Sequence, residues 1–181
     1  MIIKKAEIPE NSMLKKNEDF FDYIDSFQSM VFTKAQNVDI TIILKMFMHC
    51  GPKWADHLLA IRDKIVGLFG LKTSEQMTNN NKQIDNAKYD IGEQIGMFKL
   101  FAKSESELVL GEDDKHLSFR VSLLLEHIDY EIDKSRLSIT TAVKFNNMFG
   151  RVYFFPVKPI HRLIVRTVFK DIKEQLQRAM I

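Results

Sequence analysis

His161 is the polar residue whose position says most about possible chemistry. At 100° per residue its side chain falls between those of Ile164 and Val168, in the middle of the apolar face of a predicted helix. An imidazole titrates near neutral pH, so in a cavity it could transfer protons or orient a ligand. The alternative is a neutral core histidine that is hydrogen-bonded to a strand or a water. His161 is therefore the candidate catalytic residue and the first candidate ligand-binding residue.

Three further polar residues are candidates for the same site. Tyr153 lies two helical turns before His161, at the edge of the same face, where its ring suits a pocket mouth or a filled core. Asp25 alternates with two aromatic residues in a predicted strand; facing inward it needs a partner or a raised pKa, and facing outward it is solvated. Thr141 is the only hydroxyl on the apolar face of another strand, which β propensity alone would also explain. Together these residues predict the convergent polar groups of an apolar pocket.

Other reactive residue types form no recognisable site in the sequence. His49, Cys50 and His57 do not share a helical face, and no Cys-x-x-Cys or His-Glu-x-x-His pattern occurs, so we expect no metal site. Cys50 is the only cysteine, which excludes an internal disulfide, and we expect it to be a small buried apolar residue. No Gly-rich dinucleotide fingerprint is present, so we expect no cofactor.

Several charged residues are expected at the surface. Arg120 alternates with two serines, which indicates an outer-surface ion pair, whereas Asp113 and Asp114 are expected to shape a hairpin turn. A row of cations follows the last helix on the side away from the apolar face, and it consists of Arg162, Arg166, Lys170 and Lys173. A solvated helix face is the default interpretation of this row. The alternative is transient contact with an anionic membrane.

Composition limits the classes of function. The chain has 181 residues, and 26 Lys and Arg against 24 Asp and Glu give a net charge of +2. This balance argues against a nucleic-acid binder, whose contacts with the phosphate backbone need a basic excess. The 14 Phe and 9 Met predict a bulky, adaptable interior, either solid or hollow. The N-terminus does not have the pattern of a signal peptide, and no apolar run approaches the roughly 20 residues of a spanning helix, so we expect a cytoplasmic protein.

Periodicity predicts the elements that must position these residues. A short edge strand and a turn are expected within residues 1–19, and a helix over 40–49 begins after Asp39. A second helix follows Pro52, with an apolar stripe from Trp54 to Phe69. Residues 72–94 are expected to form a polar, Asn-rich loop. The other predicted elements are strands over 22–27, 96–103, 107–111, 117–126 and 136–146, and a helix over 148–180 that is kinked or restarted near Pro156 and Pro159.

Alternation in the later strands predicts an antiparallel sheet with one apolar and one wet face. A curved sheet wrapped around the final helix would bury every apolar face of the chain. We therefore expect a single α+β domain over residues 1–181 with a helix-grip architecture.

The sequence also resembles a known family nearly end to end. The segments that carry the resemblance are Asp22–Phe27, Leu58–Asp63, Gly70–Thr73, Glu107–Gly111, Asp113–Ser122, Gly150–Tyr153 and Pro159–Val165. They are similar to a bacterial family catalogued as a domain of unknown function, whose members stand alone or follow epimerase-type short-chain dehydrogenase domains. The chain departs from the family pattern in the Asn-rich loop near residue 80 and in an insertion at Asp129–Lys134.

This resemblance implies kinship with the START/SRPBCC helix-grip superfamily, which holds apolar ligands between the sheet and the C-terminal helix. We therefore expect non-covalent binding of a hydrophobic small molecule or lipid, oriented by His161, Tyr153, Thr141 and Asp25. The expected walls are Phe98, Phe119, Val143, Phe145, Val157 and Val168. One alternative is a cyclase, dehydratase or isomerase with His161 as acid or base. Another is a module with a filled core that binds a partner or a membrane surface.

Overall fold

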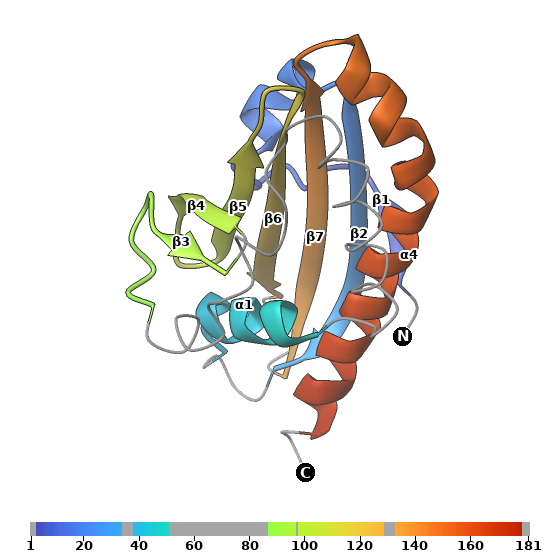
Figure 1. Cartoon of the computed structure of the whole chain (residues 1–181). Coiled ribbons are helices and arrows are strands. Elements are labelled where there is room, and N and C mark those ends of the chain that lie inside the picture. Colours follow the sequence, from blue (N-terminus) through green and yellow to red (C-terminus); the bar gives the residue numbers. More distant parts are fainter. Residues whose placement is uncertain (1–2, 34–37, 51–86, 97, 129–132, 179–181) are drawn as a thin grey trace.

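A computed structural model describes residues 3–33, 38–50, 87–96, 98–128 and 133–178. The predicted second helix, most of the predicted loop over 72–94 and residues 129–132 of the insertion lie outside these ranges. The described residues form one antiparallel sheet with two α-helices on one face, which confirms the predicted α+β, helix-grip-like class (Figure 1).

The sheet has seven strands in the order β1-β2-β7-β6-β5-β4-β3. Each strand pairs antiparallel with its neighbours. The second strand continues past its predicted end at residue 27 and the seventh begins before its predicted start at residue 136, because the two strands pair with each other there. The strands are β1 (Lys4–Ala6), β2 (Tyr23–Phe32), β3 (Gln94–Ile95), β4 (Phe98–Lys103), β5 (Glu107–Asp113), β6 (Leu117–His127) and β7 (Lys134–Phe145).

Helix α1 (Ile40–His49) has the predicted bounds. It begins at Asp39, whose Oδ1 accepts a hydrogen bond of 2.7 Å from the backbone N–H of Thr41. This side chain satisfies one of the N–H groups that an α-helix leaves free at its start. The helix lies over β5 and β6 and contacts α4 (Met148–Arg178) at its side.

Helix α4 runs without interruption along β2 and β7 (Figure 1). Of the two predicted alternatives, a kink or a restart near the prolines, the restart is therefore wrong. Pro156 and Pro159 are both exposed, and the carbonyls that lose an N–H partner to them belong to Val152 and Phe155, which are also exposed. Water can satisfy these two carbonyls, so the helix continues across both prolines. Among the described residues, no helix has the length and apolar character needed to cross a membrane.

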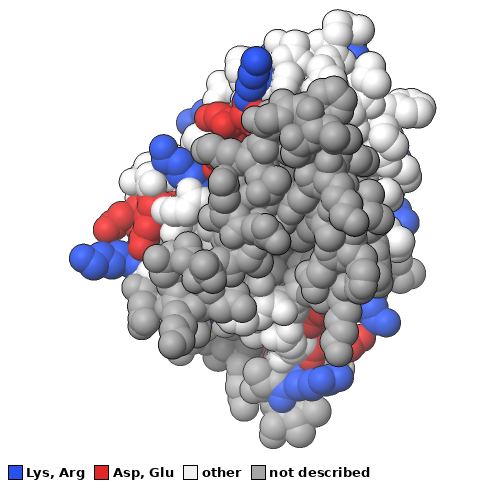
Figure 2. All heavy atoms as spheres, viewed as in Figure 1, with Lys and Arg blue, Asp and Glu red and all other residues white. Residues whose placement is uncertain are grey.

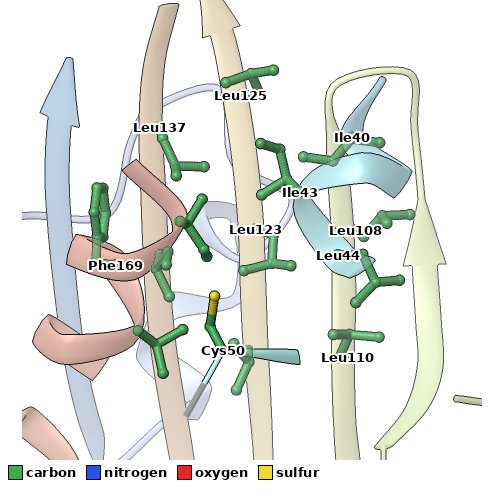
Figure 3. Close-up of a cluster of buried hydrophobic side chains, with 14 of the residues drawn as sticks. Ile40, Ile43, Leu44, Cys50, Leu108, Leu110, Leu123, Leu125, Leu137 and Phe169 are labelled. Atoms are coloured by element: carbon green, nitrogen blue, oxygen red, sulfur yellow. The ribbon is translucent and has the colours of Figure 1, made fainter. Parts of the chain in front are cut away.

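The main core lies between the two helices and the concave face of the sheet. Ile43 and Leu44 of α1 point towards Leu108 and Leu123 of the sheet (Figure 3). Phe169 of α4 is completely buried in the same cluster. The burial of these apolar side chains is the main force that holds both helices against the strands.

The opposite face of the sheet is partly covered, which corrects the expectation of a wet face. Ile8 and Leu14 of the N-terminal segment pack against Val109 and Ala142 of the strands. This segment includes the short 3-10 helix η1 (Lys15–Phe20), drawn in blue on the far side of the sheet from α1 and α4 (Figure 1).

Glu107 joins the N-terminal segment to this outer face. Its carboxylate is buried and accepts hydrogen bonds from the Ser12 hydroxyl at 2.6 Å, the Ser122 hydroxyl at 2.5 Å and the backbone N–H of Met13 at 2.7 Å. A buried carboxylate is tolerated when its oxygens receive donors in this way. We interpret Glu107 as a structural residue of the described fold.

The substitution Glu107→Gln tests this structural role. The amide has one acceptor oxygen in place of two, and its NH₂ group would face one of the donors that Glu107 now satisfies. We expect a loss of about 1–3 kcal/mol in the free energy of unfolding, measured by urea denaturation. Glu105→Gln, at an exposed position two residues earlier, is the matched control and should change stability little. Equal stability of the two variants would contradict the role given to Glu107.

Candidate functional site

The site is centred on Asp25, a carboxylate buried between the sheet and α4. Asp25 is 2% exposed. Its Oδ2 accepts hydrogen bonds from the Tyr23 hydroxyl and from Nε of Arg162, both at 2.9 Å. Its Oδ1 lies 3.5 Å from Nζ of Lys5. A charge taken out of water is costly unless partners surround it, and here these partners come from β1, β2 and α4.

The strand pattern explains why these groups meet. Tyr23, Asp25 and Phe27 occupy alternate positions of β2 and therefore share the face that α4 covers. Lys5 is opposite Phe27 in the register between β1 and β2, so it reaches Asp25 from the sheet edge. Arg162 reaches the same carboxylate from the flank of α4 with its long side chain.

Asp25 also affects the ionisation of its neighbours. Burial raises the pKa of the Tyr23 hydroxyl to about 12, and the hydrogen bond to Asp25 acts in the same direction. Tyr23 is therefore a hydrogen-bond donor throughout the physiological range. Lys158 lies over the same ring, with its Nζ 4.7 Å from the centroid.

His161 is adjacent to this carboxylate and is held in its neutral form. Burial lowers the pKa of the imidazole to about 4; the negative charge of Asp25 opposes this shift, and the positive charge of Arg162 adds to it. Nε2 of His161 is buried and has no hydrogen-bond partner among the described residues. The predicted position of His161 on the inner side of the helix agrees with this burial. The hydrogen bond expected for a core histidine is not found at Nε2.

Thr141 completes the polar group. It is opposite Asp25 in the register between β2 and β7, so the two side chains are neighbours on the inner face. Oγ1 of Thr141 is buried and also has no hydrogen-bond partner in the described part of the chain. Oδ1 of Asp25 has its ion pair with Lys5 but no hydrogen bond. Over the described ranges, five buried side-chain nitrogen or oxygen atoms have no hydrogen-bond partner. Three of them belong to Asp25, Thr141 and His161.

Aromatic and aliphatic side chains lie around Tyr23, the hydrogen-bond donor to Asp25. The ring of Tyr23 lies 4.9 Å from that of Phe154, and Phe145 lies 5.5 Å from Phe154. Of the predicted wall residues, Val143 and Val168 are buried. The half-buried ones are Phe98, Phe119, Phe145 and Val157. All of these residues lie in the clusters between the sheet and the helices, although Val168 belongs to the main core rather than to the cluster around Tyr23.

Tyr153 does not join the polar group around Asp25 by any described contact. Its ring is stacked with that of Phe149, 6.5 Å away and inclined by 9°, and Phe149 in turn contacts His116. These residues lie where α4 begins beside the β5–β6 hairpin. Gly150 permits this approach, because a Cβ there would collide with the carbonyl oxygen of His116. The tyrosine beside the polar group is Tyr23, which alternation with Asp25 already placed on the same face.

The row of cations predicted on α4 is not purely solvated. Arg162 forms the ion pair with buried Asp25, and Arg166 lies over the Phe27 ring, 5.1 Å from its centroid. Lys170 pairs with Glu174 at 3.7 Å. Helical angle alone could not predict the first two contacts, because a long side chain on the flank of a helix can bend towards the sheet edge.

The remaining candidates behave as structural residues. Cys50 lies in the main core, where Gln175 donates a hydrogen bond of 2.8 Å to its sulfur, and burial raises its pKa to about 11. It is thus the buried apolar residue that we expected and a poor nucleophile. Arg120 forms the predicted ion pair on the outer face, with two hydrogen bonds of 2.9 and 3.1 Å to Asp113. Within the described ranges, no group of three or more His, Cys, Asp and Glu side chains is placed to hold a metal ion.

The neutral state of His161 predicts how stability depends on pH. Its folded-state pKa of about 4 lies below the ordinary 6.5, so the unfolded chain binds a proton that the folded chain does not. Stability is therefore fully present above pH 6.5 and falls as the pH is lowered towards 4. We expect His161→Gln to remove on the order of 2 kcal/mol of this loss, measured by urea denaturation across that range.

His49→Gln, at an exposed position on α1, is the control and should keep the full loss. An NMR titration of the imidazole C–H signals provides an independent reading. A midpoint for His161 near 6.5, or pH profiles that are identical for His161→Gln and the unsubstituted protein, would contradict the buried neutral imidazole.

Comparison with known proteins gives a family but no characterised relative. The model of the family described as "Protein of unknown function (DUF2867)" matches residues 19–168, which include every strand from β2 to β7 and most of α4. No curated protein and no solved structure matches the chain. The match covers Asp25, Thr141 and His161 but begins after Lys5. On this evidence the chain belongs to the DUF2867 family.

Proposed function

We propose that this protein binds a hydrophobic small molecule or lipid non-covalently between the sheet and α4. The observation that supports the proposal is the group of three buried polar atoms, on Asp25, Thr141 and His161, that lack hydrogen bonds within the described residues. Buried polar atoms in folded proteins nearly always have partners, so a site with three such atoms fits one that an added polar group completes. A kinship with START/SRPBCC helix-grip proteins would place a ligand in the same region.

The chemistry of the three atoms favours a neutral ligand head group that can both donate and accept a hydrogen bond. The carboxylate of Asp25 can only accept, whereas the hydroxyl of Thr141 can donate. The neutral imidazole of His161 offers either a donor or an acceptor, depending on its tautomer. A hydroxyl group satisfies this combination. A ligand carboxylate would be repelled by Asp25, since desolvation strengthens the interaction between like charges.

Half-buried aromatic rings would contact the apolar part of such a ligand. Phe98 and Phe119 form an edge-to-face pair with centroids 5.9 Å apart, and Phe119 also joins the cluster around Tyr23. Flat rings and branched side chains provide a large apolar contact area. In this proposal the aromatic residues supply affinity, and Asp25, Thr141 and His161 select the head group.

The structure gives less support to the enzymatic alternative. An efficient acid or base has a pKa near the working pH, whereas burial lowers the pKa of His161 to about 4. Such an imidazole is neutral at neutral pH and is a weak base. We therefore assign His161 a role in orientation rather than in proton transfer.

A displacement experiment with Thr141→Val tests the proposal. The neutral apolar dye N-phenyl-naphthylamine serves as the fluorescent probe, and dodecanol and dodecanoate are the competitors. We expect saturable dye binding, and displacement by dodecanol at lower concentrations than by dodecanoate. Because valine keeps the shape of threonine but lacks its hydroxyl, Thr141→Val should weaken dodecanol about tenfold and leave dye binding unchanged.

Ser138→Ala is the matched control, because it also removes an unpartnered hydroxyl from β7 but on the opposite face of the sheet. It should change neither dye nor dodecanol binding. Absence of saturable dye binding would contradict the proposal and favour a filled core. A preference for dodecanoate, or equal effects of the two substitutions, would contradict the role of the polar group.

A further inference from the structure

The outward side of α4 carries a stripe of exposed apolar side chains. Phe155 is 81% exposed and Met148 is 71% exposed, and Val152 and Leu163 are also open to solvent. Their spacing of three, four and eight residues places them on one side of the helix, away from the sheet. Isolated exposed apolar residues are ordinary, but several large ones along one helix face are characteristic of an interaction surface.

Cations accompany this stripe, and acids are absent from it. The segment from Met148 to Lys170 contains Arg151, Lys158, Arg162, Arg166 and Lys170 but no Asp or Glu. Figure 2 shows uncharged atoms and no red ones at the upper right, over the first half of α4, with blue Lys or Arg atoms at the right edge below.

The adjoining sheet edge neutralises only part of this charge. Arg151 pairs with Asp22 at 3.3 Å, and Arg162 pairs with Asp25. Lys158 and Arg166 lie over the aromatic rings of Tyr23 and Phe27 and have no acidic partner among the described residues. Their charges therefore remain available to an anionic partner beside the apolar stripe.

We propose that this face of α4 docks on the surface of an anionic lipid bilayer. In this arrangement Met148, Val152, Phe155 and Leu163 enter the boundary between head groups and acyl chains. Lys158 and Arg166 contact lipid phosphates at the edge of the stripe. An amphipathic helix that combines exposed apolar residues with cations binds membranes through both apolar burial and electrostatic attraction. This surface differs from the row of cations that the sequence predicted on α4. That row begins at Arg162, whereas three of the four exposed apolar residues lie before it, nearer the start of the helix.

Charge and surface chemistry favour a bilayer over other partners. A symmetric contact between two copies would bring both sets of cations to one seam, where this stretch of helix offers no acid to pair with them. A nucleic-acid backbone would match the cations, but it would leave Phe155 and Met148 facing phosphate and water. A lipid surface provides both kinds of group, with anionic phosphates lying above an apolar layer.

Vesicle co-sedimentation of the full chain tests this docking independently of ligand binding in the interior. The vesicles are phosphatidylcholine with and without phosphatidylglycerol, at low and high salt. We expect recovery with the anionic vesicles only, reduced by salt. Removal of each surface cation typically weakens such binding roughly fivefold, so Lys158→Gln combined with Arg166→Gln should reduce the partition coefficient roughly 25-fold.

The controls separate local docking from a general effect of charge or hydrophobicity. Lys16→Gln combined with Lys103→Gln removes the same charge from exposed positions outside α4 and should leave binding nearly unchanged. Phe155→Ser should weaken binding, whereas Ile91→Ser, which also removes an exposed apolar side chain, should not.

Three results would overturn the docking proposal. They are equal recovery with neutral and anionic vesicles, equal losses in the two pairs of charge variants, and a dimer in solution that Phe155→Ser dissociates while no vesicle is bound. Dye binding measured on Phe155→Ser, whose side chain is exposed on the outward side of α4, should be unchanged. Failure of membrane docking is therefore distinguishable from failure of the ligand-binding proposal.

Discussion

The buried charge of Asp25 is the constraint on which the arrangement of α4 and the sheet edge depends. An uncompensated carboxylate at 2% exposure would be strongly destabilising, so the side chains that compensate it must be held in place. Arg162 ties α4 to β2 through this carboxylate, and Lys5 ties β1 to it from the sheet edge. These contacts bring His161, one residue before Arg162, beside the row formed by Asp25 and Thr141.

Glu107 and Asp25, two buried carboxylates on opposite faces of the sheet, differ in how their surroundings are satisfied. On the outer face, both oxygens of Glu107 accept hydrogen bonds, from the hydroxyls of Ser12 and Ser122 and from the backbone N–H of Met13. On the inner face, Asp25, Thr141 and His161 each keep a buried polar atom without a hydrogen bond among the described residues. The contrast supports a structural role for the first carboxylate and a binding role for the second.

Periodicity predicted most of the described fold because a sheet with an apolar inner face imposes a repeat of two on its strands. The row Leu137, Ile139, Thr141, Val143 in β7 and the capping of α1 by Asp39 were both predictable for this reason. The cover on the outer face was not, because Ile8 and Leu14 lie in a segment without a regular repeat. Continuity of α4 across two prolines depends on which side of the helix faces water, which only the packed structure shows.

The candidate site was predictable to the extent that it follows from alternation and helical angle. Thr141 and His161 lie on the inner side that their positions in β7 and the last helix indicated. For Asp25 the alternation in β2 left an inward and an outward direction open, and the structure shows that it faces inward. The ion pairs of Arg162 and Lys5 with Asp25 were not predicted. Periodicity assigns each residue to one face of its element, whereas a long side chain can reach a group on another face. Tyr153 lies two turns away with Phe149, since the start of α4 packs against the β5–β6 hairpin.

The most direct test of the central claim is a crystal structure of the protein with bound dodecanol. We predict electron density for the alcohol between the sheet and α4, with its hydroxyl oxygen within hydrogen-bond distance of Thr141 and of either Asp25 or His161. Density for an ordered water at these three residues, with the alcohol absent or bound only at the outer surface, would contradict the account.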